Sequence, residues 1–327
     1  MNDRTRGAPL TLSIAAVERD TGLSKDTLRV WERRYGFPVP DRDSLGERAY
    51  PLDQIDKLRL IKRLLDAGHR PGRVVLLAMD ELQQLSENMV SAPQRAGAIV
   101  LAPDDLRDHL DLIRSHDVPA LRRQLTRLLS RFGVGRFVTE VVAPLNVAVG
   151  DAWLRGQLEI HEEHAYTETV QVVLRQAIAS VPELGAEALP RVLLSTFPGE
   201  PHGLGLLMAE AIFALEGCAC VSLGVQTPIW DLSRAAAAQR SDIVALGFSG
   251  CMNPNLVSDG LAELRAKLPP KVELWAGGSA PVLHRRLIDG VRPMAALQGL
   301  PQELARWRGE ARQRALPGEP RPQGVRP

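Results

Sequence analysis

The sequence predicts a multidomain chain with an all-α winged helix-turn-helix, a four-helix bundle and a Rossmann-like (flavodoxin-like) α/β domain with a parallel sheet. Residues 10–85 are short amphipathic stretches separated by tight turns. From 104 to 183, apolar residues recur at three- and four-residue spacing with few strand formers, which favours a helical bundle. After residue 190, short apolar runs alternate with helical segments, the pattern of a parallel sheet covered on both faces: RVLLSTF, CACVSLG, DIVALGF and KVELWAG.

Composition places the chain among ordinary globular proteins and singles out no partner. The 327 residues are 45% hydrophobic and 24% charged, with a net charge of +1, so any nucleic-acid surface must be local. Cys218, Cys220 and Cys251 lack the CxxC spacing of zinc ribbons, and such a sparse set favours a reducing compartment. The N-terminus has no apolar signal core and we expect no run of bilayer length. The sequence therefore predicts a cytoplasmic protein.

The domain boundaries follow from changes in composition. Residues 86–103 mix polar, small and proline residues and are expected to be a linker. The α/β domain is expected over 188–308. Residues 1–9 and the Pro/Gly-rich end, 309–327, are expected to be disordered.

The N-terminal domain contains a candidate DNA-binding helix. LSIAAVERDTGLSKDTLRVWERRYG predicts a helix, a turn at Gly22, and a second helix with Ser24 as its N-cap. Leu28, Trp31 and Tyr35 are positioned to pack inward. Four polar residues are left outward, a composition suited to a major groove: Lys25, Thr27, Arg29 and Arg33. Two short helices with a basic, solvated face are the alternative interpretation.

The segment TLRVWERRYGFPVPDRDSLGERAY resembles the MerR family of winged-helix regulators, in the branch with TLRxWERRYGFP and a wing ending in RxY. The resemblance covers residues 11–80. It implies binding to a double-stranded DNA operator as a dimer or higher oligomer, such as a tetramer. The contacts it implies are Arg29, Arg33, Arg34, Arg48 and Tyr50.

A histidine follows the first predicted strand of the α/β domain, where doubly wound sheets bind ligands. His202 lies two residues after Glu200, close enough for the carboxylate to accept a hydrogen bond from one ring nitrogen. The other nitrogen is then a candidate metal ligand, although a loop histidine on the surface is the plainer interpretation. Because one imidazole holds a free ion poorly, the metal would arrive within a macrocycle. Gly203 and Gly205 allow a close approach of the backbone.

Glu200-Pro-His202-Gly-Leu-Gly205 resembles the (D/E)xHxxG motif of cobalamin-binding domains. The resemblance implies that His202 is the lower axial ligand of cobalt. It also implies that Ser249, in GFSG, contacts the nucleotide tail, and that Gly277 and Gly278 form a GG turn at the cofactor.

The helical segment carries a second pattern, Trp153 followed after nine residues by Glu163 and His164. A core tryptophan and a solvated helix face are the plainer interpretation. His161 and His164, one helical turn apart among glutamates, also suggest a metal pair, but no third ligand with suitable spacing is evident. The spacing resembles the Wx9EH pattern of B12-dependent MerR-type photoreceptor repressors.

That family implies a helical cap in which Trp153, Glu163 and His164 cover the upper face of adenosylcobalamin; methylcobalamin or another cobalamin is the alternative. It implies a repressor that binds DNA as an oligomer in the dark and releases it in the light. In light-sensing members a histidine follows the cap tryptophan, whereas this chain has Leu154, so the light chemistry would need His161 or His164 or would not occur.

Two other functions stay open in the sequence. One is a MerR-type regulator that responds to haem, redox state or a partner protein, with Cys251 just beyond the predicted site as a candidate sensor. The other is a corrinoid methyl-carrier protein, which the winged helix argues against. We expect no enzymatic activity.

Overall fold

The computed structural model describes residues 11–43, 45–66, 69–90, 103–182, 189–285 and 287–315. The chain divides into two compact units. The first takes in the chain up to Val118, Pro144–Tyr166 and Gly250–Asn253, and the second takes in Pro119–Ala143, Thr167–Ser249 and the chain from Pro254 onward. The predicted disordered ends lie outside the described residues, except for 309–315.

The helix-turn-helix is confirmed, with the caps that the sequence predicts. It consists of α1 (Ile14–Thr21) and α2 (Lys25–Tyr35). Gly22 ends α1 at a φ of 70°, a left-handed conformation that glycine adopts without strain. Ser24 begins α2, because its Oγ accepts a hydrogen bond from the backbone N–H of Thr27 at 3.1 Å.

The wing is an antiparallel sheet in the order β1-β3-β2, formed by Thr11–Ser13 (β1), Asp41–Arg42 (β2) and Arg48–Pro51 (β3). After it come α3 (Leu52–Asp66), α4 (Pro71–Val74) and α5 (Met79–Val90). These elements share one apolar core that includes Val17, Leu28, Trp31, Tyr50, Ile55, Leu58 and Ile61. Because α5 continues to Val90, the start of the predicted linker is helical; 91–102 lie outside the described residues.

The middle of the chain is helical, as predicted. In order it contains α6 (Pro103–Arg114), α7 (Val118–Arg136), the π-helix η1 (Phe137–Val142), α8 (Ala143–Leu154) and α9 (Ile160–Ala179). A φ of 72° at Gly133 marks a kink inside α7.

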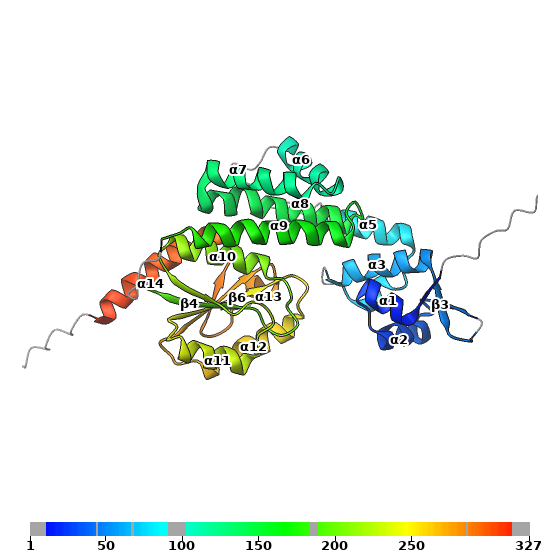
Figure 1. Cartoon of the computed structure of the whole chain (residues 1–327). Coiled ribbons are helices and arrows are strands. Elements are labelled where there is room, and N and C mark those ends of the chain that lie inside the picture. The colour runs from blue at the N-terminus through cyan, green and yellow to red at the C-terminus, as the bar shows by residue number, and fades with distance from the viewer. Residues whose placement is uncertain are drawn as a thin grey trace, which may run out of the picture. The chain divides into compact units, whose positions relative to one another are not determined.

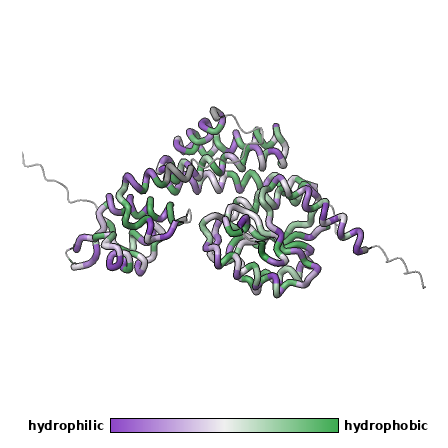
Figure 2. The backbone as a smooth tube through the Cα atoms, turned by 180° about the vertical axis from the view of Figure 1, so that it is seen from behind, coloured by the Kyte–Doolittle hydropathy of each residue, from purple (hydrophilic) through white to green (hydrophobic). Residues whose placement is uncertain are grey.

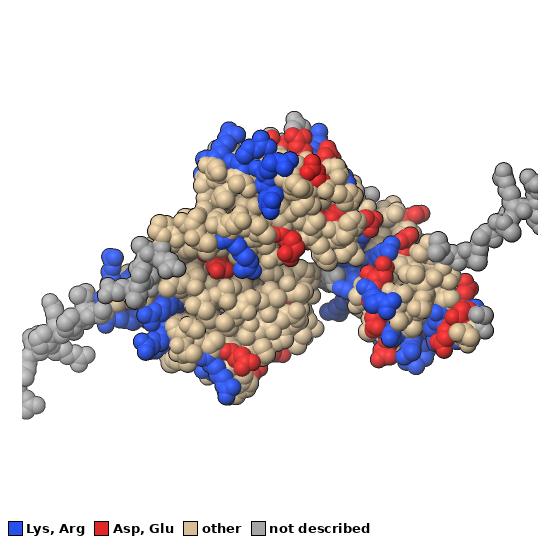
Figure 3. Space-filling view, in the orientation of Figure 1, with Lys and Arg blue, Asp and Glu red and all other residues tan. Residues whose placement is uncertain are grey.

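From the sequence, we expect no apolar run long enough to span a bilayer, and one helical run of the structure differs from this expectation. The helical run Val118–Leu154 is long and apolar enough to cross a membrane, by length and composition alone. Its first half bears exposed arginines, which gather over α7 in Figure 3: Arg122, Arg123, Arg127, Arg131 and Arg136. Other side chains of this part, including Leu121, Leu125 and Phe137, are buried. Core helices of globular proteins pass the same test, so it is weak evidence for a membrane span.

The C-terminal domain is a five-stranded parallel sheet in the order β5-β4-β6-β7-β8, the flavodoxin-like order that the fold prediction implies. Its strands are Arg191–Ser195 (β4), Ala219–Ser222 (β5), Ile243–Phe248 (β6), Glu273–Gly278 (β7) and Val291–Met294 (β8). The last strand was not predicted. The central strands are buried and form the apolar interior seen in green in Figure 2.

Helices cover both faces of this sheet (Figure 1). α10 (Leu204–Leu215) and α14 (Leu300–Ala315) pack together on one face, and α11 (Ile229–Ala238) and α12 (Pro254–Lys267) pack together on the other. The short α13 (Val282–Arg285) follows β7, and the 3₁₀ turn η2 (Leu297–Gly299) precedes α14.

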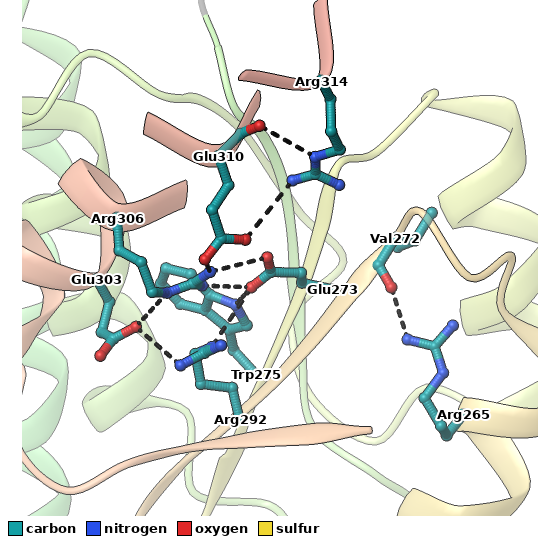
Figure 4. A network of polar contacts seen from close by, with 9 residues as sticks. All are labelled: Arg265, Val272, Glu273, Trp275, Arg292, Glu303, Arg306, Glu310 and Arg314. Atoms are coloured by element: carbon teal, nitrogen blue, oxygen red, sulfur yellow. Dashed lines mark hydrogen bonds and ion pairs between the residues drawn. The ribbon is translucent and has the colours of Figure 1, made fainter. Parts of the chain in front are cut away.

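A network of charges anchors α14 to the sheet (Figure 4). Arg306 on α14 donates hydrogen bonds to Glu273 of β7 at 2.6 Å and to Glu303 at 2.9 Å. Trp275 Nε1–H also donates to Glu273 at 2.8 Å. Burial opposes ionisation of Glu273, but these hydrogen bonds outweigh it and hold its pKa below the ordinary value. The network explains why α14 continues to residue 315, although disorder is expected from residue 309.

Candidate functional site

Polar residues at the carboxyl ends of β4 and β6 form a connected cluster. These two strands are neighbours, and the chain continues from β4 to β5 on one side and from β6 to β7 on the other. This arrangement is a topological switch point, the position where open α/β sheets bind ligands. Glu200 lies in the loop after β4, and Ser249 follows the last residue of β6.

Glu200 connects the two loops. Its side chain is fully buried, and Oε2 accepts hydrogen bonds from the backbone N–H of Ser249 at 2.6 Å and from the Ser249 hydroxyl at 2.8 Å. Oε1 accepts from the backbone N–H of His202 at 3.1 Å and from its ring Nδ1 at 2.7 Å. Burial opposes ionisation of Glu200, but these donors outweigh it, so its pKa lies below the ordinary value.

The Glu200 contact fixes the tautomer of His202. An ionised carboxylate only accepts hydrogen bonds, so Nδ1 carries the proton and a neutral ring has its lone pair on Nε2. The side chain is 57% exposed, in contrast to the buried carboxylate behind it. This donor set fits the expected axial ligand: a solvent-facing imidazole whose other nitrogen is held by a carboxylate, the arrangement usual at metal-bound histidines.

The four predicted glycines have different surroundings. A Cβ at Gly278 would lie 2.1 Å from the Phe248 carbonyl oxygen, and its φ of +112° is strained for other residues. A Cβ at Gly203 would lie 2.8 Å from Val225, and one at Gly277 3.2 Å from Met294. Gly205 has open space, so the fold alone does not require a glycine there.

A pocket of about 200 Å³ lies beside this loop and is lined in part by Pro201, Gly203, Glu210, Ser222 and Val225. Ligand sites of drug-sized molecules are typically about 300–1,000 Å³. The pocket therefore has room for a fragment of a large cofactor rather than for a whole macrocycle.

The predicted cap residues lie at the end of α8 and the start of α9. The Arg63 guanidinium lies over the ring of Trp153, 5.2 Å from its centre. His164 is 70% exposed and lies 3.7 Å from the Glu163 carboxylate. Nε2 of His161 lies 3.2 Å from Nε2 of His116, so the two rings meet end to end, with 5.3 Å between their centres. Leu154, at the end of α8, offers only a hydrocarbon side chain where light-sensing members have an imidazole.

The predicted DNA contacts on α2 lie mainly on its surface. Arg29, Arg33 and Arg34 are exposed, whereas Lys25 and Thr27 are half-buried. Arg29 pairs with Asp26 at 3.3 Å, and Lys25 lies 3.6 Å from Glu18.

The two predicted contacts of the wing are placed differently. Arg48 donates two hydrogen bonds to Glu32, at 2.8 and 3.3 Å, so DNA would have to compete with this carboxylate. Tyr50 departs from the expectation: its ring is fully buried in the winged-helix core, which speaks against a DNA contact through the ring. Its hydroxyl has no hydrogen-bond partner within the described chain.

Sequence reasoning missed two residues that support these sites. Thr196 is fully buried, and its hydroxyl donates to the Glu200 carbonyl at 2.7 Å and accepts from the Gln226 N–H at 2.8 Å. The sequence offers no sign of this role of Thr196, because its partner Gln226 lies 30 residues further along the chain. Arg63 is only 8% exposed, although a helical arginine ordinarily faces solvent, and burial lowers its pKa.

Two stretches of the chain match known families. Residues 12–77 match the MerR HTH family regulatory proteins, and residues 106–178 match the B12 binding domain. The first match covers the winged helix, and the second lies in the segment from α6 to α9.

Relatives match over most of the chain. The HTH-type transcriptional repressor CarH of Myxococcus xanthus is 31% identical over 276 residues, which are 82% of this chain and 89% of CarH. CarA of the same organism, also an HTH-type transcriptional repressor, is 27% identical over 80% of this chain and 84% of CarA. Among solved structures, the monomethylamine corrinoid protein of Methanosarcina barkeri aligns with a TM-score of 0.50 and 15% identity. The alignment covers 64% of this chain and 100% of the corrinoid protein, and this similarity concerns the fold alone.

Proposed function

Because this chain belongs to the MerR-type transcriptional repressors that carry a B12-binding domain, the family of CarH, we propose that it binds operator DNA under the control of cobalamin. The observation that carries the proposal is the Glu200–His202 pair at the switch point of the sheet. We propose no enzymatic activity and a cytoplasmic location.

In this proposal, His202 would hold cobalamin in the sheet domain, with its Nε2 as the nitrogen that binds cobalt. Glu200 keeps the Nδ1 proton and so orients the ring. The backbone at Gly203, Gly205, Gly277 and Gly278 and the hydroxyl of Ser249 would accommodate the rest of the molecule. Trp153, Glu163 and His164 would cover its upper face. Adenosylcobalamin, when bound, would supply a cobalt–carbon bond that light can cleave.

We further propose adenosylcobalamin as the cofactor, light as the signal and a homo-oligomer, dimer or tetramer, as the DNA-binding form. A ligand that favours one assembly state raises the apparent DNA affinity of that state. Joining several weak winged helices raises their effective concentration at a multi-site operator. Leu154 offers no lone pair to cobalt, so a second imidazole would have to come from His161 or His164. Nε2 of His161 already lies 3.2 Å from Nε2 of His116, which favours His164.

The DNA-binding surface is proposed to be α2 with the wing. The exposed Arg29, Arg33 and Arg34 would contact bases and phosphates, with Lys25 and Thr27 at the start of the helix. Arg48 would reach a phosphate only by exchanging its bond to Glu32.

Visible spectra test the cofactor site directly. Purified protein is titrated with adenosyl-, methyl- and hydroxocobalamin in the dark. We expect a spectrum with protein imidazole bound to cobalt, its loss in His202→Ala, and its recovery when free imidazole is added to the variant. An unchanged spectrum in His202→Ala would exclude this histidine as the ligand.

Gel shifts with DNA from upstream of the protein's own gene test the regulation. We expect adenosylcobalamin to tighten binding in the dark and illumination to release the DNA. Equal binding with and without the cofactor would refute cobalamin control. Tightening that light does not reverse would leave cobalamin control in place and refute the light signal, as Leu154 would then explain.

A further inference from the structure

Three metal-ligating side chains that are not among the proposed cobalamin contacts converge in the first unit. They are His116, in the turn after α6, and His161 and Glu162, in the first turn of α9. One ligand atom from each lies within 4.8 Å of the other two. The sequence suggested only a metal pair of His161 and His164. In the structure, the imidazole beside His161 is that of His116, which lies 45 residues earlier.

The distances suit a small divalent ion. Nε2 of His116 lies 3.2 Å from Nε2 of His161 and 3.4 Å from Oε1 of Glu162. Zinc binds imidazole nitrogen at about 2.0–2.1 Å, so two nitrogens on a tetrahedral zinc lie about 3.3 Å apart. The two rings are nearly parallel, with 5° between their planes, and each must tilt by about 35° to aim its lone pair at a shared ion. Both side chains are exposed, so this tilt meets little resistance.

The backbone holds His116 in an unusual conformation. Its N–H donates to the Ile113 carbonyl and that of Asp117 donates to the Leu112 carbonyl, the hydrogen-bond pair that closes a helix with a left-handed residue. That residue is usually glycine, but here it is a histidine at a φ of 58°. This backbone conformation places the side chain of His116 beside the first turn of α9, where its ring can still rotate.

Glu162 has one oxygen committed and one directed at the histidines. Its Oε2 accepts a hydrogen bond from the Glu159 N–H at 2.7 Å, which caps the start of α9. Its Oε1 is the atom that lies near His116. The side chain is only 10% exposed, and a buried carboxylate is stabilised by a cation.

We propose that His116, His161 and Glu162 form a Zn²⁺ site, distinct from the cobalt of cobalamin, with water as the fourth ligand. Two imidazoles and a carboxylate are a zinc donor set, and a fourth position open to solvent is typical of such three-ligand sites. The ion joins the end of α6 to the first turn of α9, directly before Glu163 and His164.

The test uses the full chain without cobalamin, stripped of metal by a chelator and free of any histidine tag. Zn²⁺ is titrated in competition with a chromophoric chelator. We expect one equivalent to bind, with affinity reduced at least tenfold in His116→Ala and in Glu162→Gln. Glutamine keeps an oxygen that can cap α9 but lacks the charge. His284→Ala and Cys251→Ser, which alter an exposed imidazole and an exposed thiol outside the cluster, should bind as the wild type does.

Thermal unfolding gives the second measurement. Zn²⁺ should raise the Tm of the wild type and leave that of His116→Ala unchanged, because a ligand stabilises only a fold that binds it. If His116→Ala fails to fold by circular dichroism, His161→Gln takes its place. Absence of saturable binding by the wild type, or wild-type affinity in the cluster variants, overturns the proposal. Because cobalamin is omitted throughout, the result is independent of the proposed function.

Discussion

Replacing Glu200 by glutamine keeps the shape of the side chain but removes its charge and one of its two acceptor oxygens. The carboxylate accepts four hydrogen bonds, two of them from backbone N–H groups on opposite sides. In either orientation, the amide nitrogen of glutamine faces one of these donors, the N–H of His202 or that of Ser249. A buried donor left without an acceptor costs about 1–3 kcal/mol, and each hydrogen bond to a charged group contributes about 1.5–3 kcal/mol. We therefore expect the free energy of unfolding to fall by about 2–4 kcal/mol at neutral pH.

Urea unfolding followed by circular dichroism measures this loss, and its pH dependence tests the cause. The folded-state pKa of Glu200 lies below the ordinary value of 4.5, so its stabilisation is fully present above that value. It is lost as pH falls through the lower folded-state pKa, so the difference between wild type and variant should shrink in acid. The matched control is Glu263→Gln, an exposed carboxylate whose ion pair within the described residues is with Lys267 at 3.4 Å. This variant should change stability by less than about 0.5 kcal/mol. A loss at Glu200 no larger than this would refute the reasoning.

Three further outcomes follow from the described contacts. Gly278→Ala should lower the free energy of unfolding in urea by more than about 3 kcal/mol, since its Cβ would meet a carbonyl at 2.1 Å. Gly205→Ala, in open space within α10, should raise it by about 0.5–1 kcal/mol, and equal effects of the two variants would contradict the difference in their surroundings. Arg33→Ala should weaken operator binding and lower the slope of log K against log salt by about 1, as loss of one phosphate contact requires; an unchanged slope in a salt titration would rule the contact out. Arg63→Met should change the free energy of unfolding by less than about 1 kcal/mol, because methionine fills similar space and removes a buried charge whose Nε has no partner in the described chain. The variant loses only a weak attraction to Trp153, so a loss above 3 kcal/mol in the same assay would show that the guanidinium itself is required.

Local signals predicted the fold well where the determining contacts are local. Gly22 and Ser24 set the turn and the second helix through hydrogen bonds within a few residues. The last strand was missed because it is four residues long and contains Pro293, which weakens a strand signal. The end of α14 was missed because Arg306 anchors it to Glu273, 33 residues earlier.

The candidate site was predictable in its parts but not in its connections. Strand periodicity and the switch-point rule place Glu200, His202 and Ser249 at one edge of the sheet. That a single carboxylate joins both loops depends on packing across 49 residues of sequence. His116 and His161 lie 45 residues apart, so sequence spacing alone could not show that the fold brings His116 beside His161 and Glu162.

The carboxylate between β4 and β6 also has an entropic consequence. Because Glu200 is tied to both loops, the imidazole of His202 loses its rotational freedom when the sheet folds rather than when a ligand arrives. Immobilising such a side chain at the moment of binding costs about 0.5–1.5 kcal/mol. If His202 binds cobalt as proposed, the metal centre would meet a preorganised donor, and part of its affinity would be drawn from the conformational stability of the domain.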